Sequence, residues 1–589
     1  MTMAADPGRG VVGRRTLMAA VGALAGLAGW FLIEELPGLV DGDRLVLFLT
    51  AAAGAFFFAL LAASGALAMR AALAVSALVS VGPAALLTWA SLRYDAVDDF
   101  LATGHPLVAF GLVVCLSLPF LVVAFRPEER WRSYPALFRQ SWDIAVRYAA
   151  AWIFTGAFWV VLYLSDALLD LVGLEIIRDI LDVEVMPPVL TGAALGLALA
   201  VVAELADYIS PFLILRLLRL LMPVVLLVTL VFLGALPFRG LSALFGGLSA
   251  AAVLLAMGVG IATLITAVID REDAEAASTG VLRLSAQVLA LTLPLLSGLA
   301  LYAVWLRVAD YGWSPDRVAA ACAGAVGMGY GVLYSAAVVV RRDWMERVRR
   351  ANIAMALAVI ALAALWLTPL LNAEAVSARS QVSRYASGKV PAEALDLWFI
   401  GRDLGRAGDA ALDRLRAVGD GDDELAERMA RLETAANRWD FESADRETTA
   451  TETANGLLAE ILATVAVVPS DRSLDPALLA GAALPQLRTW QAACRRNTPG
   501  GNPGCVVMFA DLLPDSAGDE AVLFTMNAAG VVSLNALDAG NFSALRYLRG
   551  VPADLSAATL DRVIDGDVAI TQPALRSLDL GGVEVLILP

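Results

Sequence analysis

Residues 291–350 decide the fold that this sequence predicts. They contain two apolar runs, LTLPLLSGLALYAVW (291–305) and VAAACAGAVGMGYGVLYSAAVVV (318–340), with the polar segment RVADYGWSPDR (307–317) between them and RRDWMERVRR (341–350) after them. An α-helix needs about 20 apolar residues to cross a bilayer, and arginines gather on its cytoplasmic side. The stretch therefore predicts a membrane hairpin whose arginine-rich end faces the cytoplasm.

Composition extends this interpretation to most of the chain. Hydrophobic residues make up 59% of the 589 positions, and the mean hydropathy is +0.71, whereas soluble domains are about half apolar. The net charge of −15 is unevenly spread, because residues 372–589 hold 31 acidic and 19 basic side chains. We therefore expect an α-helical polytopic membrane protein over residues 1–371, followed by an acidic soluble domain over residues 372–589.

Eleven apolar segments predict eleven transmembrane helices. The first follows Arg14-Arg15 and ends at Ile33. Its two arginines also resemble a twin-arginine export signal, but we favour an uncleaved first helix because many further spans follow. Those spans are predicted at Leu45–Leu67, Ala72–Ala90, Pro106–Ala124, Ala149–Leu171, Pro187–Leu205, Leu221–Leu236, Leu248–Val268, Arg283–Trp305, Val318–Val340 and Ile353–Leu371.

The distribution of arginine predicts the orientation. With the amino terminus inside, 18 arginines fall in cytoplasmic segments and six in outer loops, which is the bias of membrane proteins in general. An odd number of spans then places the carboxy-terminal domain outside. Lys389 is the only lysine, which is typical of a GC-rich bacterial genome, so we expect a multi-pass protein of the bacterial cytoplasmic (inner) membrane with a periplasmic carboxy-terminal domain.

Three groups of residues resemble a known family. They are Leu137-Phe-Arg-Gln-Ser-Trp142 with Phe158-Trp159 and 169–177, the turn Tyr311-Gly-Trp-Ser-Pro-Asp-Arg317, and Ser380-Gln381 with Arg384. Their order and spacing resemble the uncharacterised bacterial membrane family called domain of unknown function 4153. The resemblance implies a multi-span bundle and an outer domain, and it brings no activity with it. Aromatic and arginine residues over 126–147 further predict an interfacial elbow helix before the fifth span.

Charged residues near predicted spans are candidates for function, because ionisable groups at membrane depth are costly. Glu204 and Asp207 precede Pro211, and Arg216 and Arg219 follow it, so pairing across a turn is one interpretation. Snorkelling at the cytoplasmic interface is the simpler one.

Asp166 and Asp170 form a second candidate pair. They are four residues apart, so they share one helix face. Together they would suit a cation or a proton relay, or they simply end the fifth span.

Small residues four apart predict close helix packing. The pairs are Gly22 with Gly26, Gly192 with Gly196, and Gly327 with Gly331. Packing within the bundle is the preferred explanation, with homodimerisation as the alternative.

The turn of the hairpin holds Asp310, Tyr311, Gly312 and Arg317. Ser314 before Pro315 predicts a helix start. We expect Arg317 either to stabilise the turn against Asp310 or to hold a ligand.

The residues after 371 predict a soluble α+β domain. Helical periodicity covers 373–468, with helices expected at Ala373–Ser387, Pro391–Val418, Asp423–Trp439 and Thr453–Val468, and strand-like segments lie within 505–589, at Cys505–Phe509, Ala521–Met526, Val531–Leu534 and Val583–Leu588. Cys494 and Cys505 flank a turn-rich segment, and in an oxidising compartment they should form a disulfide.

Little in the sequence suggests catalysis or a cofactor. His105 is the only histidine, which excludes a histidine metal cluster, and we place it in an outer loop far from the other polar candidates. Asp511, Asp515, Asp519 and Glu520 resemble a calcium loop only weakly, because an EF-hand needs an oxygen ligand and a glycine where Leu513 and Ser516 stand. We name no catalytic residue and expect no metal, no cofactor and no nucleic-acid partner, and an intramembrane enzyme is a distant third among the possible functions.

Two classes of function remain. The first is an envelope scaffold or sensor, anchored in the lipid bilayer, whose outer domain binds a periplasmic protein or cell-wall component. The second is a transporter or lipid flippase that uses the charged residues of the bundle. We favour the first because the outer domain takes up over a third of the chain and no span has a strongly polar face.

Overall fold

The computed structural model describes residues 7–205, 212–239, 250–512, 518–537, 555–571, 577–579 and 584–586. Within these ranges eleven helices are long and apolar enough to cross a membrane, which confirms the predicted number. The chain forms two compact units, residues 1–429 and 430–589.

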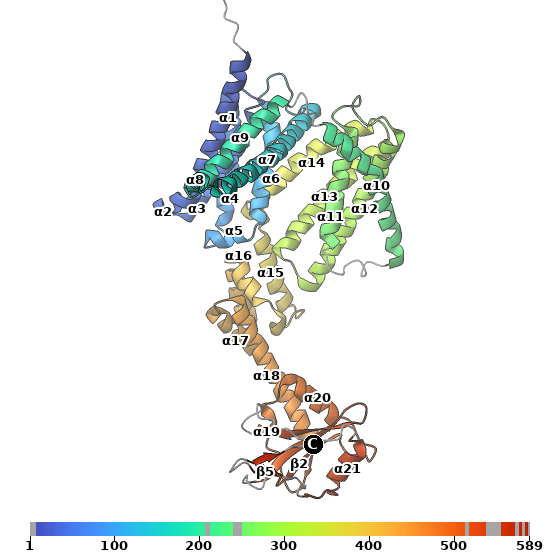
Figure 1. The fold of residues 1–589 in the computed structure, drawn as a ribbon. Helices are drawn as coiled ribbons and strands as arrows, with labels where there is room; N and C mark the ends of the chain where they lie inside the picture. The colour runs from blue at the N-terminus through green and yellow to red at the C-terminus, as the bar shows by residue number, and fades with distance from the viewer. Residues whose placement is uncertain are drawn as a thin grey trace, which may run out of the picture. The chain divides into compact units, whose positions relative to one another are not determined.

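The spans lie in the first unit (Figure 1). They are α1 (Pro7–Trp30), continued by η1 (Phe31–Glu35) and α2 (Leu36–Leu39), then α3 (Asp43–Ala63), α4 (Met69–Ser91), α6 (His105–Ala124), α7 (Tyr134–Asp170), α9 (Met186–Leu205), α10 (Phe212–Arg239), α11 (Ala250–Ile269), α12 (Gly280–Tyr311), α13 (Pro315–Val340) and α14 (Trp344–Trp366). Two short helices, α5 (Val97–Ala102) and α8 (Ile176–Leu181), lie in the connections.

The spans form two groups. One contains α1, α3, α4, α6, α7 and α9, and the other contains α10 to α13, each with its own apolar core. Helix α14 lies between the groups and packs against α6 of the first and α13 of the second (Figure 1). The bundle is therefore divided along α14.

The predicted elbow before the fifth span is wrong. Helix α7 is one continuous helix of 37 residues, and Ala136, Leu137 and Phe138 in its first turns are buried. No glycine or proline interrupts the sequence between Pro135 and Gly156, so nothing breaks the helix where the elbow was expected.

The glycine pairs pack within the bundle. A Cβ atom added to Gly22 on α1 would lie 1.9 Å from the carbonyl oxygen of Gly192 on α9, and one added to Gly192 would lie 2.0 Å from the carbonyl oxygen of Gly22. On α13, a Cβ at Gly331 would lie 2.7 Å from the backbone nitrogen of Pro294 on α12. The missing side chains let these backbones touch, as small residues do between membrane helices.

The first compact unit continues beyond the last span. It includes η3 (Pro369–Leu371), α15 (Ala373–Ala386), η4 (Ala392–Ala394), η5 (Phe399–Asp403), α16 (Gly405–Val418) and the start of α17 (Asp423–Thr434). The loop after α4 holds this region: the backbone N–H of Arg406 donates to the carbonyl of Arg93 at 2.9 Å, and the Tyr94 hydroxyl donates to the carbonyl of Asp403 at 2.9 Å. The boundary between the two compact units, after residue 429, therefore lies later in the chain than the change of composition near residue 372.

The second unit is an α+β domain. Its elements are α18 (Arg438–Thr464), β1 (Ala466–Val468), α19 (Ala477–Ala480), α20 (Leu484–Cys494), β2 (Cys505–Ala510), β3 (Glu520–Met526), β4 (Val532–Leu537), α21 (Ala557–Ile564), β5 (Ser577–Asp579) and β6 (Glu584–Leu586). Strands β1 to β4 form one sheet in that order, with β1 parallel to β2 and the other pairs antiparallel, and β5 pairs with β6.

Alternation along the strands gives this sheet two apolar faces. Val507 packs with residues of α18 and α20, whereas its neighbour Val506 packs with residues of α21. The prediction of helix up to Val468 is wrong: α18 ends at Thr464, and 466–468 pair with β2. The run Val-Ala-Val-Val suits a strand because branched side chains pack well on a pleated surface.

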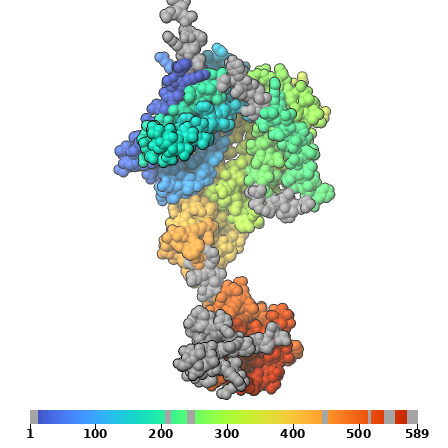
Figure 2. All heavy atoms as spheres, in the orientation of Figure 1, coloured from blue at the N-terminus to red at the C-terminus, as the bar shows by residue number. Residues whose placement is uncertain are grey.

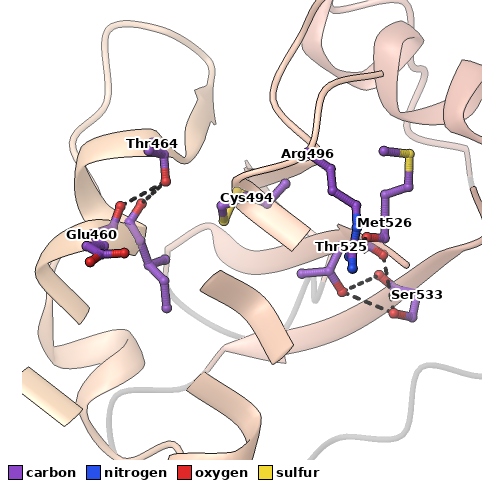
Figure 3. The surroundings of a disulfide bond; sticks show 9 residues. Glu460, Thr464, Cys494, Arg496, Thr525, Met526 and Ser533 are labelled. Carbon is purple, nitrogen blue, oxygen red and sulfur yellow. Dashed lines mark hydrogen bonds between the residues drawn. A yellow bond between two sulfur atoms is a disulfide. The ribbon is translucent and has the colours of Figure 1, made fainter. Parts of the chain in front are cut away.

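Cys494 and Cys505 form the expected disulfide, with Cα atoms 4.7 Å apart. The bond joins the end of α20 to the start of β2 (Figure 3). Nearby, Thr525 and Ser533 hydrogen-bond across β3 and β4 at 3.0 Å between hydroxyl oxygens.

Candidate functional site

A cavity of about 810 Å³ lies between the two groups of spans. We call it the chamber. Residues of α6, α7, α11, α12, α13 and α14 line it, and the lining contains no Asp, Glu, Lys or Arg among the described residues. Along α14 it extends from Asn352 to Trp366, about 21 Å at 1.5 Å per residue. Figure 2 shows the furrow between the helices coloured blue to teal and those coloured green.

Large apolar side chains face the chamber without filling it. Val108 on α6 and Val259 on α11 keep 65% and 68% of their surface exposed. The volume is within the 300–1,000 Å³ range of small-molecule sites, which are mostly apolar with a few placed polar groups. A group of hydrogen-bonded polar side chains lies at each of the two ends of the chamber, which we call the His105 end and the Tyr134 end.

A buried charge cluster closes the His105 end. Arg93 Nη1 lies 3.1 Å from Glu374 Oε2, and His105 Nε2 lies 3.4 Å from Glu374 Oε1. The Trp366 Nε1–H donates to His105 Nδ1 at 3.0 Å, so neutral His105 carries its proton on Nε2, facing the carboxylate. The Glu374 side chain is fully buried and that of Arg93 is 7% exposed.

Arg93 also holds the end of the last span. Its Nη2 donates to the carbonyls of Trp366 at 2.5 Å and Thr368 at 2.9 Å, and the first of these is one of the last carbonyls of α14, which a helix end leaves without backbone partners. Burial and the negative charge of Glu374 raise the pKa of the neighbouring Tyr94 hydroxyl well above its usual range. Arg93 thus ties the loop after α4 to the end of α14 and the start of α15.

Four polar side chains from four helices meet at the Tyr134 end. Asn352 Nδ2 donates to the Tyr134 hydroxyl at 3.0 Å, and Tyr334 donates its hydroxyl to Asn352 Oδ1. Thr266 Oγ1 lies 3.5 Å from both Tyr334 Oη and Asn352 Nδ2. Tyr334 is fully buried, so this network satisfies polar groups inside the bundle.

Two arginines hold the turn after α11, next to the Tyr134 end. Arg349 donates to the carbonyls of Ile269 at 2.7 Å and Asp270 at 3.1 Å, and Arg219 donates to the carbonyl of Ala267 at 2.8 Å and pairs with the Asp270 carboxylate. Cations at a helix carboxyl end complement its dipole, so these arginines have a structural role at the turn.

The family-like turn contacts the helix that follows the last span. Ser380 Oγ accepts from the Trp313 N–H at 3.1 Å, and Arg384 donates to the carbonyls of Ala309 at 2.9 Å and Asp310 at 2.5 Å. Gly312 has φ +78°, and a Cβ there would lie 2.8 Å from Arg384 Cδ, so a side chain would strain the backbone and displace the Arg384 side chain from the turn.

Arg317 stabilises the turn through a partner other than the expected Asp310. Its Nη1 donates to the carbonyl of Gly312 at 2.7 Å, and its guanidinium lies 5.6 Å from the centre of the Tyr311 ring. Helix α15 is therefore fixed at two places, by Glu374 at the His105 end and by Ser380 and Arg384 at the turn.

Pairing of Glu204 with Arg216 or Arg219, one of the two interpretations of these charges, is not found. Glu204 Oε2 lies 2.6 Å from Arg15 Nη2 on α1, and Arg219 pairs with Asp270. Arg216 is exposed, and Asp207 lies outside the described residues. The close packing of α1 on α9 explains the choice, because it brings Arg15 to Glu204.

Asp166 and Asp170 share one arginine. Arg178 on α8 places Nη2 3.6 Å from Asp166 and Nη1 3.9 Å from Asp170. This pairing neutralises part of the charge that a bound cation would have balanced. Neither aspartate lines the chamber.

Two of the weak calcium candidates contact other groups of the domain. Asp519 pairs with Arg472, and Glu520 accepts from the Leu512 N–H at 2.8 Å. Asp515 lies outside the described residues and Asp511 within them. Among described residues no group of three or more His, Cys, Asp or Glu is placed to hold a metal ion.

Sequence reasoning missed the residues that close the chamber. The sequence predicts that His105 lies in a loop far from the other polar groups, whereas it begins α6 and contacts Glu374. Arg93 is 281 residues from Glu374. The sequence does hold a hint of this pair. Arg93 is one of six arginines in the predicted outer loops, and Glu374 is the first acidic residue after the last predicted span.

Comparison with known families gives one match. A family model described as "Domain of unknown function (DUF4153)" matches residues 43–415, which include the chamber, both its ends, α15 and most of α16. Searches of curated proteins and of solved structures gave no match.

Proposed function

Since the chain belongs to the family described as domain of unknown function 4153, whose description names no activity, we propose a function from the geometry of the bundle. The protein is an integral membrane sensor that takes the hydrocarbon chain of an amphiphilic lipid into the chamber and passes its presence to α15. The observation that carries this proposal is the 810 Å³ apolar chamber with a charged cluster at one end.

The chemistry of the chamber favours a hydrocarbon occupant. Apolar cavities stay dry and accept apolar molecules, and this one is surrounded by helices that are themselves apolar enough to lie in lipid. Most of the side chains between the two ends are apolar and offer water no hydrogen bond. A lipid chain would contact the apolar walls between them.

The His105 end supports a role in signalling. An occupant of this end would touch His105 and Trp366. His105 contacts Glu374 directly, and Trp366 is linked to Glu374 through its hydrogen bond to His105. Glu374 belongs to α15, which leads into the helices after the last span. A shift of His105 away from Glu374 would take one polar partner from a fully buried carboxylate. Buried charges are strongly destabilised by the loss of a partner.

Location and orientation are part of the proposal. We place the protein in a bacterial cytoplasmic membrane with its amino terminus inside and residues 430–589 in the periplasm. The arginine bias supports this orientation, and so does the Cys494–Cys505 disulfide, since such bonds persist in oxidising compartments. A periplasmic protein or envelope component would then read the state of the outer domain.

Two natural cysteines offer a test of occupancy. Cys322 lines the chamber, whereas Cys115 on α6 is exposed and is not part of its lining. We expect phosphatidylglycerol to slow alkylation of Cys322 by N-ethylmaleimide about tenfold at ten times its Kd, because only the empty state reacts. Alkylation of Cys115 should keep its rate and serves as the control. Unchanged alkylation of Cys322 with every long-chain lipid tried would rule the proposal out.

A lipid carrier is the second candidate. The observation in its favour is that polar side chains occur at both ends of the chamber, where the headgroup of a lipid would rest before and after crossing. Neither Asp166 nor Arg216 lines the chamber, so the charged path expected of a transporter is not the one found. Measuring exchange of a fluorescent lipid between the leaflets of vesicles containing the protein separates the two candidates.

A further inference from the structure

A second cavity adjoins the Tyr134 end of the chamber. Its volume is about 450 Å³, and Tyr134 and Ile353 belong to the linings of both cavities. We call it the vestibule. Four arginines line it, Arg132, Arg271, Arg349 and Arg350, together with Glu272, Asp273 and Glu346. An apolar space and a charged space therefore adjoin at Tyr134 and Ile353, which is the order in which the chain and the headgroup of one lipid follow each other.

Among the charged side chains that line the vestibule, Arg132 and Glu272 form no ion pair within the residues that the structure describes. Arg349 pairs with Asp273 at 2.7 Å, and Arg350 pairs with Glu346 at 3.0 Å. Arg271 pairs with Glu275, which lowers the pKa of that carboxyl. Arg132 lies 4.2 Å from the centre of the Trp131 ring and pairs with no carboxylate in the part of the chain that the structure describes. Arg132 is two residues from Tyr134, and Tyr134 lines both the vestibule and the chamber.

Arg350 can join Arg132. Its side chain is 76% exposed and that of Glu346 is 46% exposed, and exposed ion pairs contribute little to stability. Guanidinium groups bind phosphate through two parallel hydrogen bonds. A phosphate in the vestibule would thus gain two arginines while the buried Arg349 keeps its place.

We propose that the occupant is an anionic phospholipid, with its phosphate held in the vestibule by Arg132 and Arg350 and its chain in the chamber. This inference rests on the proposed function and names the class of lipid. A lipid without phosphate would fill the chamber but leave Arg132 without an anion.

Protection of Cys322 from alkylation distinguishes the outcomes, using the full-length protein in neutral detergent. Dioleoyl phosphatidic acid and dioleoylglycerol share their chains and differ in the phosphate. We expect phosphatidic acid to protect Cys322 at a concentration at least about tenfold lower, the effect of one good charge-assisted contact. Arg132→Ala should remove most of this advantage and leave protection by dioleoylglycerol unchanged. Arg130→Ala is the matched control, because Arg130 is exposed and does not line the vestibule.

Each other outcome has a definite meaning. Equal protection by the two lipids would overturn the headgroup site and leave the chamber in place. Protection by neither would overturn the proposed function itself. Release of phosphatidic acid by an equal concentration of inorganic phosphate would assign the vestibule to free phosphate and overturn the lipid assignment. A loss of preference in Arg130→Ala as large as that in Arg132→Ala would reduce the effect to general surface charge and overturn the site.

Discussion

Replacing Glu374 by alanine should lower the free energy of unfolding by about 3–5 kcal/mol, the cost of leaving a buried charge without its partner. Arg93 would keep its place beside the carbonyls of Trp366 and Thr368 but lose its counter-charge in a site where it is only 7% exposed. Thermal unfolding of the purified protein in detergent, followed by tryptophan fluorescence, measures the effect.

A second variant separates charge from packing. Replacing both Arg93 and Glu374 with leucine removes both charges, and apolar replacement of a buried pair is often tolerated. We expect this double variant to be more stable than Glu374→Ala. Glu393→Ala is a control, because Glu393 is an exposed acid in η4 of the same compact unit. If Glu374→Ala unfolds at the same temperature as the control, the buried cluster has no structural role.

The second large effect is expected at the contact between α1 and α9. Gly22→Ala should destabilise the protein by about 3 kcal/mol or more, because overpacking a tight contact typically costs 1–3 kcal/mol and the added Cβ would meet the Gly192 carbonyl oxygen at 1.9 Å. That atom belongs to a rigid helix backbone and cannot turn aside.

Gly29 on the same helix is the matched control. A Cβ at Gly29 meets no neighbouring atom within 4 Å, so Gly29→Ala should change stability little or raise it slightly by its helix propensity. The two variants differ only in the position of one methyl group. Similar melting temperatures for both would mean that α1 and α9 do not pack through their glycines.

The spans were predictable because their signal is local. Hydropathy over about 20 residues marks each helix without knowledge of its neighbours, and all eleven predicted segments overlap helices of the structure. The turn at Gly312 was predictable in the same way, since Ser314 does accept the N–H of Arg317. Disulfide pairing followed from two cysteines separated by 11 positions.

The chamber was not predictable because long-range packing creates it. Its ends depend on pairs such as Arg93 with Glu374 and Tyr134 with Asn352, whose members lie 281 and 218 residues apart. No periodicity in a single sequence reports such distances. The partner of Glu204 was unpredictable for the same reason: the pairing interpretation considers the nearest arginines along the chain, beyond Pro211, whereas the packing of α1 on α9 brings Arg15 close.

The most direct measurement is an electron cryo-microscopy map of the protein in nanodiscs made from its own membrane lipids. We predict elongated density inside the chamber, running along α14 between Asn352 and Trp366, with its polar end in the vestibule beside Arg132. A map in which α7 and α11 close upon α14 and leave no room for a lipid chain would contradict the proposal that this protein binds lipid within its bundle.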